Sequence, residues 1–277
     1  MCIIAIKKSG TPIDWNMLDT CDLNNPDGAG YAYATTDGVV ISKGYFGNDE
    51  IERAIKAEGI DTTALTMIFH FRIATHGAVN EGTCHPFPMT SDVDALTATD
   101  VIAPIAVAHN GIIPRMPNDK DLSDTMLFIR DYMAPLGDSI NKDAVRNLIS
   151  KLAASKLAIM TPENLYLIGD FIDKDGWLFS NDTYKEMAWT KYVKEDISTR
   201  GAGTSTDRIN REWNDDDWNK WAEYYESAEY NDDSVLAYCD SCGDEYEVTD
   251  TSQDKIGDAL WALCTDCTEQ VSAKMNS

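Results

Sequence analysis

The sequence predicts an α+β fold in which layered sheets are covered by helices. Over residues 1 to about 185, short runs rich in Ile, Val, Phe and Tyr alternate with turn signals, which is typical of β-strands. Clusters of Gly, Asp and Asn, such as NNPDGAG and DKDG, separate several of these runs. Helical segments fall between groups of strands, and this order favours sheets packed under helices.

Apolar runs predict eight strands, at residues 2–7, 29–35, 39–46, 67–75, 104–113, 156–160, 164–171 and 176–182. Three segments are predicted as helices, at residues 47–59, 121–133 and 141–155. The first of these helices has an Asn-Asp start and a Gly stop, which are common end signals.

A different pattern begins after the predicted core, which we place at residues 1–205. Four aromatic or apolar residues of segment 206–235 share one face of a predicted helix: Trp218, Trp221, Tyr225 and Ala228. From Arg211 to Asp250 the chain carries fourteen Asp or Glu and two Lys or Arg, a net charge of −12. Such a run is usually a solvated surface, and a docking face for a basic partner is the alternative.

The composition excludes several classes of function. The 277-residue chain has a net charge of −24, which argues against binding a nucleic-acid backbone. No run approaches the ~18 consecutive apolar residues of a membrane helix. No basic segment followed by a long apolar stretch marks a secretory signal. We therefore expect a cytoplasmic protein that binds neither nucleic acid nor membrane.

The last predicted segment, residues 236–277, contains two C-x-x-C pairs separated by twenty-one residues: Cys239, Cys242, Cys264 and Cys267. This spacing is typical of a tetrahedral zinc site with four thiolate ligands, as in zinc-ribbon or treble-clef modules. Iron or disulfides are the alternatives. Because four protein ligands close the site, its expected role is structural, as a staple for a short segment.

Cys2 directly follows the initiator methionine, at the head of a predicted strand. The ordinary role of a cysteine there is that of a small buried apolar residue. Loss of Met1 would instead leave a thiol and a free α-amine on one residue. That combination supplies a nucleophile and its base together.

Arg72 lies in the apolar strand MIFHFRIAT, where an unpaired charge would cost several kcal/mol. The Arg72 guanidinium is expected either to form a structural ion pair or to bind a substrate carboxylate through two hydrogen bonds. Asn110-Gly111 ends another apolar strand, either as a simple turn or as an amide and an N–H group aimed at an oxyanion. In LSDTMLF, Ser123 or Asp124 is expected to cap a helix, and a carboxylate there could alternatively hold a substrate ammonium group.

Taken in order, Met-Cys, NPDGAGYAY, HFRIATHG, HPF, HNGII and SDT resemble the successive motifs of the class II glutamine amidotransferases, which are N-terminal-nucleophile hydrolases. The resemblance covers residues 2 to 185. It implies that the domain at residues 1–205 is a four-layer αββα sandwich of two antiparallel sheets.

The resemblance also implies catalytic roles. Cys2, exposed by loss of Met1, would attack the glutamine side-chain amide, and its own α-amine would be the base. This amine suits the task because its ordinary pKa of about 8 lies near working pH. Asn110 and the Gly111 N–H would hold the oxyanion.

Substrate-binding roles are implied in the same way. Arg72 would pair with the α-carboxylate of glutamine and Asp124 with its α-ammonium group, while Thr75 and His76 would line the pocket. Since this scheme needs no other base, the remaining histidines are expected to be structural: His70, His85 and His109.

The expected activity is release of ammonia from L-glutamine. The resemblance implies a consumer of that ammonia, and the stretch of chain after residue 185 is too short for a fused synthase domain. A separate acceptor enzyme is therefore the expected partner, with segment 206–235 as a candidate docking element. Two alternatives are a hydrolase of another γ-glutamyl amide and a non-catalytic, acidic, zinc-containing interaction protein.

Overall fold

A computed structural model of the chain describes residues 2–73, 79–117 and 119–185, together with the backbone of four short strands between residues 236 and 262. The chain divides into two compact units, Met1–Ala222 and Glu223–Ser277. The predicted boundaries at residues 205 and 235 stay a prediction. The predicted acidic helix of segment 206–235 lies outside the described residues.

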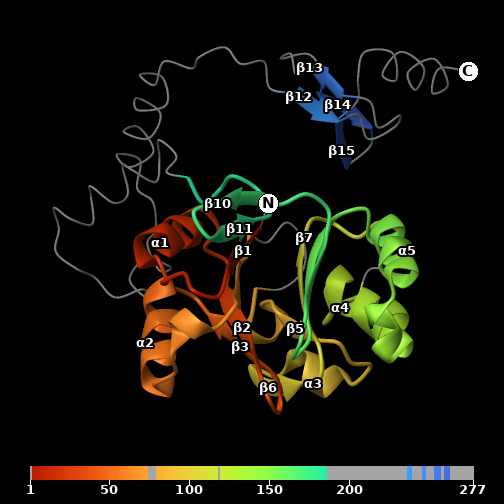
Figure 1. The fold of residues 1–277 in the computed structure, drawn as a ribbon. Coiled ribbons are helices and arrows are strands. Elements are labelled where there is room, and N and C mark those ends of the chain that lie inside the picture. The colour runs from red at the N-terminus through yellow and green to blue at the C-terminus, as the bar shows by residue number, and fades with distance from the viewer. Residues whose placement is uncertain are drawn as a thin grey trace, which may run out of the picture. The chain divides into compact units, whose positions relative to one another are not determined.

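Two antiparallel sheets form the centre of the first unit (Figure 1). The larger sheet has seven strands, in the order β10 (Ile172–Lys174), β11 (Trp177–Phe179), β1 (Ile3–Lys7), β4 (Met67–Phe71), β2 (Ala29–Thr35), β3 (Gly38–Tyr45) and β6 (Asp100–Ala103). The smaller sheet has four strands, in the order β5 (Phe87–Pro88), β7 (Ala106–Asn110), β8 (Lys156–Met160) and β9 (Leu165–Ile168).

Helices lie on the outer faces of both sheets (Figure 1). The α-helices are α1 (Trp15–Asn24), α2 (Asn48–Glu58), α3 (Val93–Thr97), α4 (Asp124–Phe128) and α5 (Asp143–Ala153). A π-helical turn, Ile129–Met133, and a 3-10 segment, Ala134–Asn141, continue α4. Two further 3-10 turns span Thr62–Ala64 and Glu81–Thr83.

Alternation along the strands separates the layers, because successive side chains of a strand point to opposite faces. On β1, Ile3 and Ala5 pack in the cluster under α1 and α2, whereas Ile4 and Ile6 pack in the cluster that also holds side chains of the smaller sheet. Small residues fill much of this second cluster: Ala32, Ala106, Ala108 and Ala158. The two sheets therefore pack face to face on a layer of small and branched apolar side chains.

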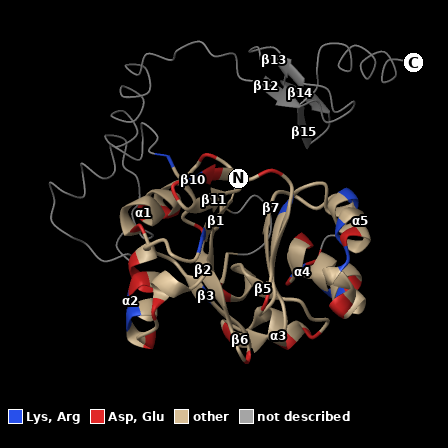
Figure 2. Cartoon of the chain, viewed as in Figure 1, with Lys and Arg blue, Asp and Glu red and all other residues tan. Residues whose placement is uncertain are grey.

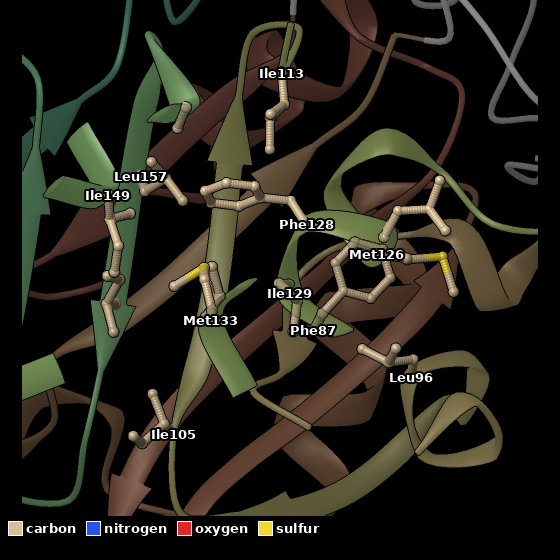
Figure 3. Close-up of a cluster of buried hydrophobic side chains, with 14 of the residues drawn as sticks. Phe87, Leu96, Ile105, Ile113, Met126, Phe128, Ile129, Met133, Ile149 and Leu157 are labelled. Carbon is tan, nitrogen blue, oxygen red and sulfur yellow. The ribbon is translucent and has the colours of Figure 1, made fainter. Parts of the chain in front are cut away.

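A third cluster covers the outer face of the smaller sheet (Figure 3). Phe87 and Leu157 from the strands meet Met126 and Phe128 of α4 and Ile149 of α5. The layers of the first unit thus run helix, sheet, sheet, helix. The predicted α+β class with two antiparallel sheets is confirmed.

Two helices that the sequence predicted, α2 and α5, are amphipathic. Helix α2 ends at Gly59, whose left-handed φ of 66° is the conformation that favours glycine after a helix. Acids and bases alternate along its outer face and along α5 (Figure 2), and Arg53 and Lys56 each pair with an acid four residues earlier. This pattern is typical of a solvated helix face.

Helix α1 and strands β5, β6 and β10 were not predicted. Helix α1 buries only Leu18 and Cys21 as apolar residues, and it is capped by Asp14, whose carboxylate accepts from the Met17 N–H. The strands are two to four residues long, and every residue of β10 is exposed. Short segments with so little apolar surface carry no readable periodicity.

Among the described residues, no helix combines the length and the apolar character that crossing a bilayer requires. Within the second unit the structure describes two strand pairs. Strand β12 (Leu236–Tyr238) pairs with β13 (Glu245–Glu247), and β14 (Gln253–Ile256) pairs with β15 (Ala259–Ala262), both antiparallel.

The layer of small residues between the sheets predicts intolerance to larger side chains. We expect Ala158→Leu to lower the free energy of unfolding by about 1–3 kcal/mol, because the facing sheet leaves no room for the added atoms. Ala144→Leu, on the exposed start of α5, is the matched control and should change it by less than about 0.5 kcal/mol. Denaturant unfolding measures both, and equal midpoints would contradict the packing described.

Candidate active site

A cavity of about 570 Å³ lies beside the start of β1. Four predicted site residues line it together although they are far apart in the sequence: Cys2, Arg72, Gly111 and Asp124. Asn110 adjoins the cavity through Gly111 but is not one of its lining residues. Thr75, His76 and the four C-terminal cysteines lie outside the described residues.

Cys2 is held at the cavity by the strand that begins directly after it. Strand β1 pairs with β4 on one side and with β11 on the other, so its first residues have little freedom. The Cys2 thiol contacts the carbonyl oxygen of Ile73 at 3.6 Å. Burial raises the pKa of the Cys2 thiol, and the nearby charge of Arg72 opposes this only in part. The thiol therefore keeps its proton at neutral pH, and attack by the sulfur needs a base.

Arg72 is fixed directly after β4. Its backbone N–H donates to Gly28 O at 2.7 Å, and its carbonyl accepts from the Asp27 N–H at 2.9 Å. Both partners belong to the NPDGAGYAY segment. The guanidinium is buried, and its Nη1 donates to Thr83 Oγ1 at 2.7 Å. A positive charge thus stands at the cavity with its orientation set by Thr83, a residue that the sequence reasoning missed.

Gly111 occupies a position that only glycine fits. Its φ of 139° lies in the region that side chains disfavour, and a Cβ there would stand 2.7 Å from the Cβ of Ser155. The backbone of Gly111 can therefore approach the cavity closely. The neighbouring Asn110 has its Nδ2 atom 2.9 Å from Ser180 Oγ, while its Oδ1 atom is buried with no hydrogen-bond partner among the described residues.

Asp124 is the first residue of α4. Its Oδ2 accepts from the Ile113 N–H at 2.8 Å and its Oδ1 from the Thr125 N–H at 2.7 Å. The helix cap itself is Ser123, whose hydroxyl accepts from the Met126 N–H. Of the two residues expected to cap this helix, Ser123 therefore does so, and the Asp124 carboxylate is fixed beside the cavity by two backbone donors.

His109 is held as one neutral tautomer by its neighbours. The Ser155 hydroxyl donates to Ala153 O at 2.9 Å, so it accepts from the Nε2–H of His109 at 2.7 Å. The other ring nitrogen, Nδ1, then accepts from the Thr125 hydroxyl at 2.8 Å. His109 thereby ties the strand that carries Asn110 to helix α4, which carries Asp124.

Two more buried histidines stand beside His109. His70 Nε2 lies 3.0 Å from the carbonyl oxygen of His109, and the ring of His85 stacks on His70 with centroids 4.2 Å apart. Burial lowers the pKa of His70 to about 3 and that of His109 to about 4, and it holds the pKa of His85 well below its usual range. At neutral pH all three rings are uncharged. Their expected structural role stays a prediction.

Over the described residues, no group of three or more His, Cys, Asp or Glu side chains is placed to hold a metal ion. Besides Thr83, the cavity wall includes the segment 112–117, directly after Gly111. This wall was not predicted: its Ile, Pro and Met residues carry no chemical signature, and its one charged residue, Arg115, does not interrupt an apolar run.

The sequence matches no protein-family model, and no match is found among curated proteins. The fold is similar to a solved structure of glutamine phosphoribosylpyrophosphate (PRPP) amidotransferase from B. subtilis in complex with ADP and GMP. The TM-score is 0.44 and the sequence identity 17%, over 65% of this chain and 41% of that chain. This chain thus spans less than half of that enzyme, and a likeness of this degree indicates neither activity nor substrate.

The three buried histidines predict a pH-dependent stability. Their pKa values are lowered in the folded state, so as pH falls below about 6.5 the unfolded chain binds protons that the folded chain does not. Each histidine should then remove about 1.4 kcal/mol of stability per pH unit, until the pH reaches its folded pKa. Imidazole ¹⁵N spectra at pH 5.5 should show three neutral rings. A charged ring among them would contradict this burial.

Proposed function

We propose that this protein hydrolyses the side-chain amide of L-glutamine and releases ammonia, as a glutamine amidotransferase of the N-terminal-nucleophile type. The observation that carries the proposal is the cavity itself. It gathers a thiol, a cation, a glycine N–H and a carboxylate from four separate segments, at Cys2, Arg72, Gly111 and Asp124.

Charge complementarity supports an amino-acid substrate. The buried guanidinium of Arg72 suits the α-carboxylate of glutamine, and a charge-assisted pair of this kind is among the stronger hydrogen bonds in proteins. The Asp124 carboxylate suits the α-ammonium group. Thr75 and His76 are proposed to complete this pocket.

The chemistry starts from a neutral thiol, because burial raises the pKa of Cys2. Once Met1 is removed, the Cys2 α-amine takes the proton from Sγ as the sulfur attacks the amide carbon of glutamine. The Gly111 N–H and the Asn110 side-chain amide stabilise the resulting oxyanion.

Collapse of this intermediate breaks the C–N bond, and the amine returns the proton so that ammonia leaves. Water then attacks the γ-glutamyl thioester, the α-amine accepts one of its protons, and glutamate and the free thiol are released. Each step uses only the substrate, water and groups of the chain. No histidine is needed as a proton carrier.

The ammonia is proposed to pass to a separate acceptor enzyme. The acidic and aromatic segment 206–235 is the proposed docking element, because its sequence combines an aromatic stripe with a dense negative charge. A partner for it would present a basic surface.

A second candidate is hydrolysis of a larger γ-glutamyl amide. The cavity volume of about 570 Å³ lies in the range of pockets that hold drug-sized ligands. The wall formed by segment 112–117 therefore leaves room for a substituent on the amide nitrogen. Comparing glutamine with N-substituted glutamine amides as substrates separates the two candidates.

The proposed chemistry predicts that Cys2→Ala abolishes glutamine hydrolysis. The rate of ammonia release should fall by on the order of 10⁴-fold, because no other group supplies the nucleophile. The matched control is Cys21→Ala, which removes a buried thiol that does not line the cavity and should leave the rate unchanged.

A chain with a cleavable N-terminal extension should also be inactive and should gain activity when cleavage exposes Cys2, because the α-amine is the base. An extended chain with full activity would refute the amine's role. A wild-type chain from which intact mass shows Met1 to be lost, yet which releases no ammonia from glutamine, would exclude glutamine hydrolysis and leave the hydrolase of another γ-glutamyl amide and the interaction protein.

The C-terminal cysteines are proposed to bind one structural zinc ion. In sequence, Cys239 and Cys242 fall between the paired strands β12 and β13, and Cys264 and Cys267 come after β15. A strand pair whose connecting sequence carries a C-x-x-C motif supports a zinc-ribbon arrangement. Four thiolates form a donor set that suits Zn²⁺.

This proposal predicts about one zinc ion per full-length chain, measured by elemental analysis. Cys242→Ser should lose the metal, whereas Cys21→Ser should retain it. A chain that carries iron, or that carries no metal and has these cysteines in disulfides, would contradict the zinc assignment.

A further inference from the structure

Ser180 and Asn181 come directly after strand β11 and join the parts of the candidate site. Ser180 is fully buried, and its N–H donates to Ile4 O at 2.9 Å while its Oγ accepts from the Ile4 N–H at 2.9 Å. The same Oγ lies 2.9 Å from the Asn110 side chain. Asn181 Nδ2 donates to Cys2 O at 2.8 Å. Two consecutive residues thus hold both the chain at Cys2 and the carboxamide of Asn110.

Further contacts fix this dipeptide itself. The Ser180 carbonyl accepts from Lys156 Nζ at 2.6 Å, and Lys156 stands directly opposite Asn110 in the pairing of β7 with β8. The Asn181 Oδ1 accepts from the backbone N–H and the hydroxyl of Thr183 at 3.1 and 2.8 Å. The side chain of Asn181 therefore has one orientation, with Nδ2 toward Cys2.

The hydrogen bonds around Asn110 determine which way its carboxamide is turned. With Nδ2 toward Ser180, the serine oxygen receives two donors, from Ile4 N–H and from Asn110. The Asn110 Oδ1 is then buried without a donor, and the Ser180 hydroxyl hydrogen has no acceptor among the described residues. Two polar groups would be left unsatisfied, which is costly in a buried site.

The side-chain oxygen and nitrogen of Asn110 can be told apart only by the hydrogen bonds they make. If the two atoms are exchanged, the Ser180 hydroxyl gains an acceptor. The Ser180 hydroxyl still accepts from the Ile4 N–H and now donates to Asn110 Oδ1. The Asn110 Nδ2 then becomes a donor with no hydrogen-bond partner among the described residues. An amide donor of this kind is what an oxyanion requires.

We propose that Ser180 is a positioning residue that turns the Asn110 carboxamide so that its N–H₂ group is free for the oxyanion, while Asn181 fixes Cys2. The inference rests on the proposed function for its catalytic consequence only. The orientation of the carboxamide itself is a property of the resting protein.

Neutron diffraction from crystals of the deuterated full-length protein tests the orientation without any activity. The expected result is a deuteron on Ser180 Oγ directed at Asn110, and two deuterons on the opposite Asn110 atom. Deuterons on the Asn110 atom that faces Ser180 would overturn the proposal, whether or not the protein is an enzyme.

A double-mutant cycle in glutamine hydrolysis tests the consequence. We expect Asn110→Ala to lower kcat by about 10²–10³-fold and Ser180→Ala to lower it by about 10–100-fold, with little change in KM. Because Ser180 acts through Asn110, the double variant should be no slower than Asn110→Ala alone. If the double variant lowered kcat by the product of the two single factors, the proposal would be overturned.

Two further variants separate positioning from folding. Ser42→Ala is the matched control: its hydroxyl is also buried on the larger sheet, where it bonds Asp100 and Tyr45 away from the cavity. It should keep the wild-type kcat even if its melting temperature falls. Ser180→Cys retains a similar size and a weak donor, so its kcat should lie between those of wild type and Ser180→Ala. If kcat followed melting temperature across all these variants, Ser180 would be structural only.

Discussion

The pairing of β1 on both of its edges is the constraint on which the candidate site depends. Strand β4 on one side ends just before Arg72, and strand β11 on the other runs into Ser180 and Asn181. Hydrogen bonding in the sheet therefore sets the place of Cys2 relative to a cation and to the residues that hold its backbone. The helices and the second sheet fix this arrangement by packing on both faces.

Charge and protonation are set by the same burial. The cavity combines a thiol whose pKa is raised and a buried guanidinium with the uncharged imidazoles of His85 and His109. Such surroundings keep the Cys2 thiol protonated at neutral pH. In the proposed mechanism the base is the α-amine of Cys2 itself, which needs no additional side chain near the sulfur.

Much of this arrangement was readable from the sequence, for identifiable reasons. Helix α2 has a periodic apolar face and signals at both ends, whereas α1 has a capping Asp14 but few buried apolar residues. Four site residues could be picked out because each is a charged residue, a cysteine or a glycine at an apolar strand or a helix start: Cys2, Arg72, Gly111 and Asp124. The structure gathers all four around one cavity. Ser180 and Thr83 gave no such signal, since their importance comes from which distant residues they touch. The orientation of Asn110 depends on hydrogens shared across three strands, which no local pattern encodes.

Cys2 is proposed to be a nucleophile that attacks a γ-glutamyl group. The most direct measurement is reaction of the full-length protein with a chloroketone analogue of glutamine, followed by peptide mass mapping. A single adduct is expected, on the Cys2 sulfur, and its formation should slow in the presence of excess glutamine. An adduct on Cys21 or Cys84 instead, or a Cys2 adduct formed at the same rate with and without glutamine, would contradict it.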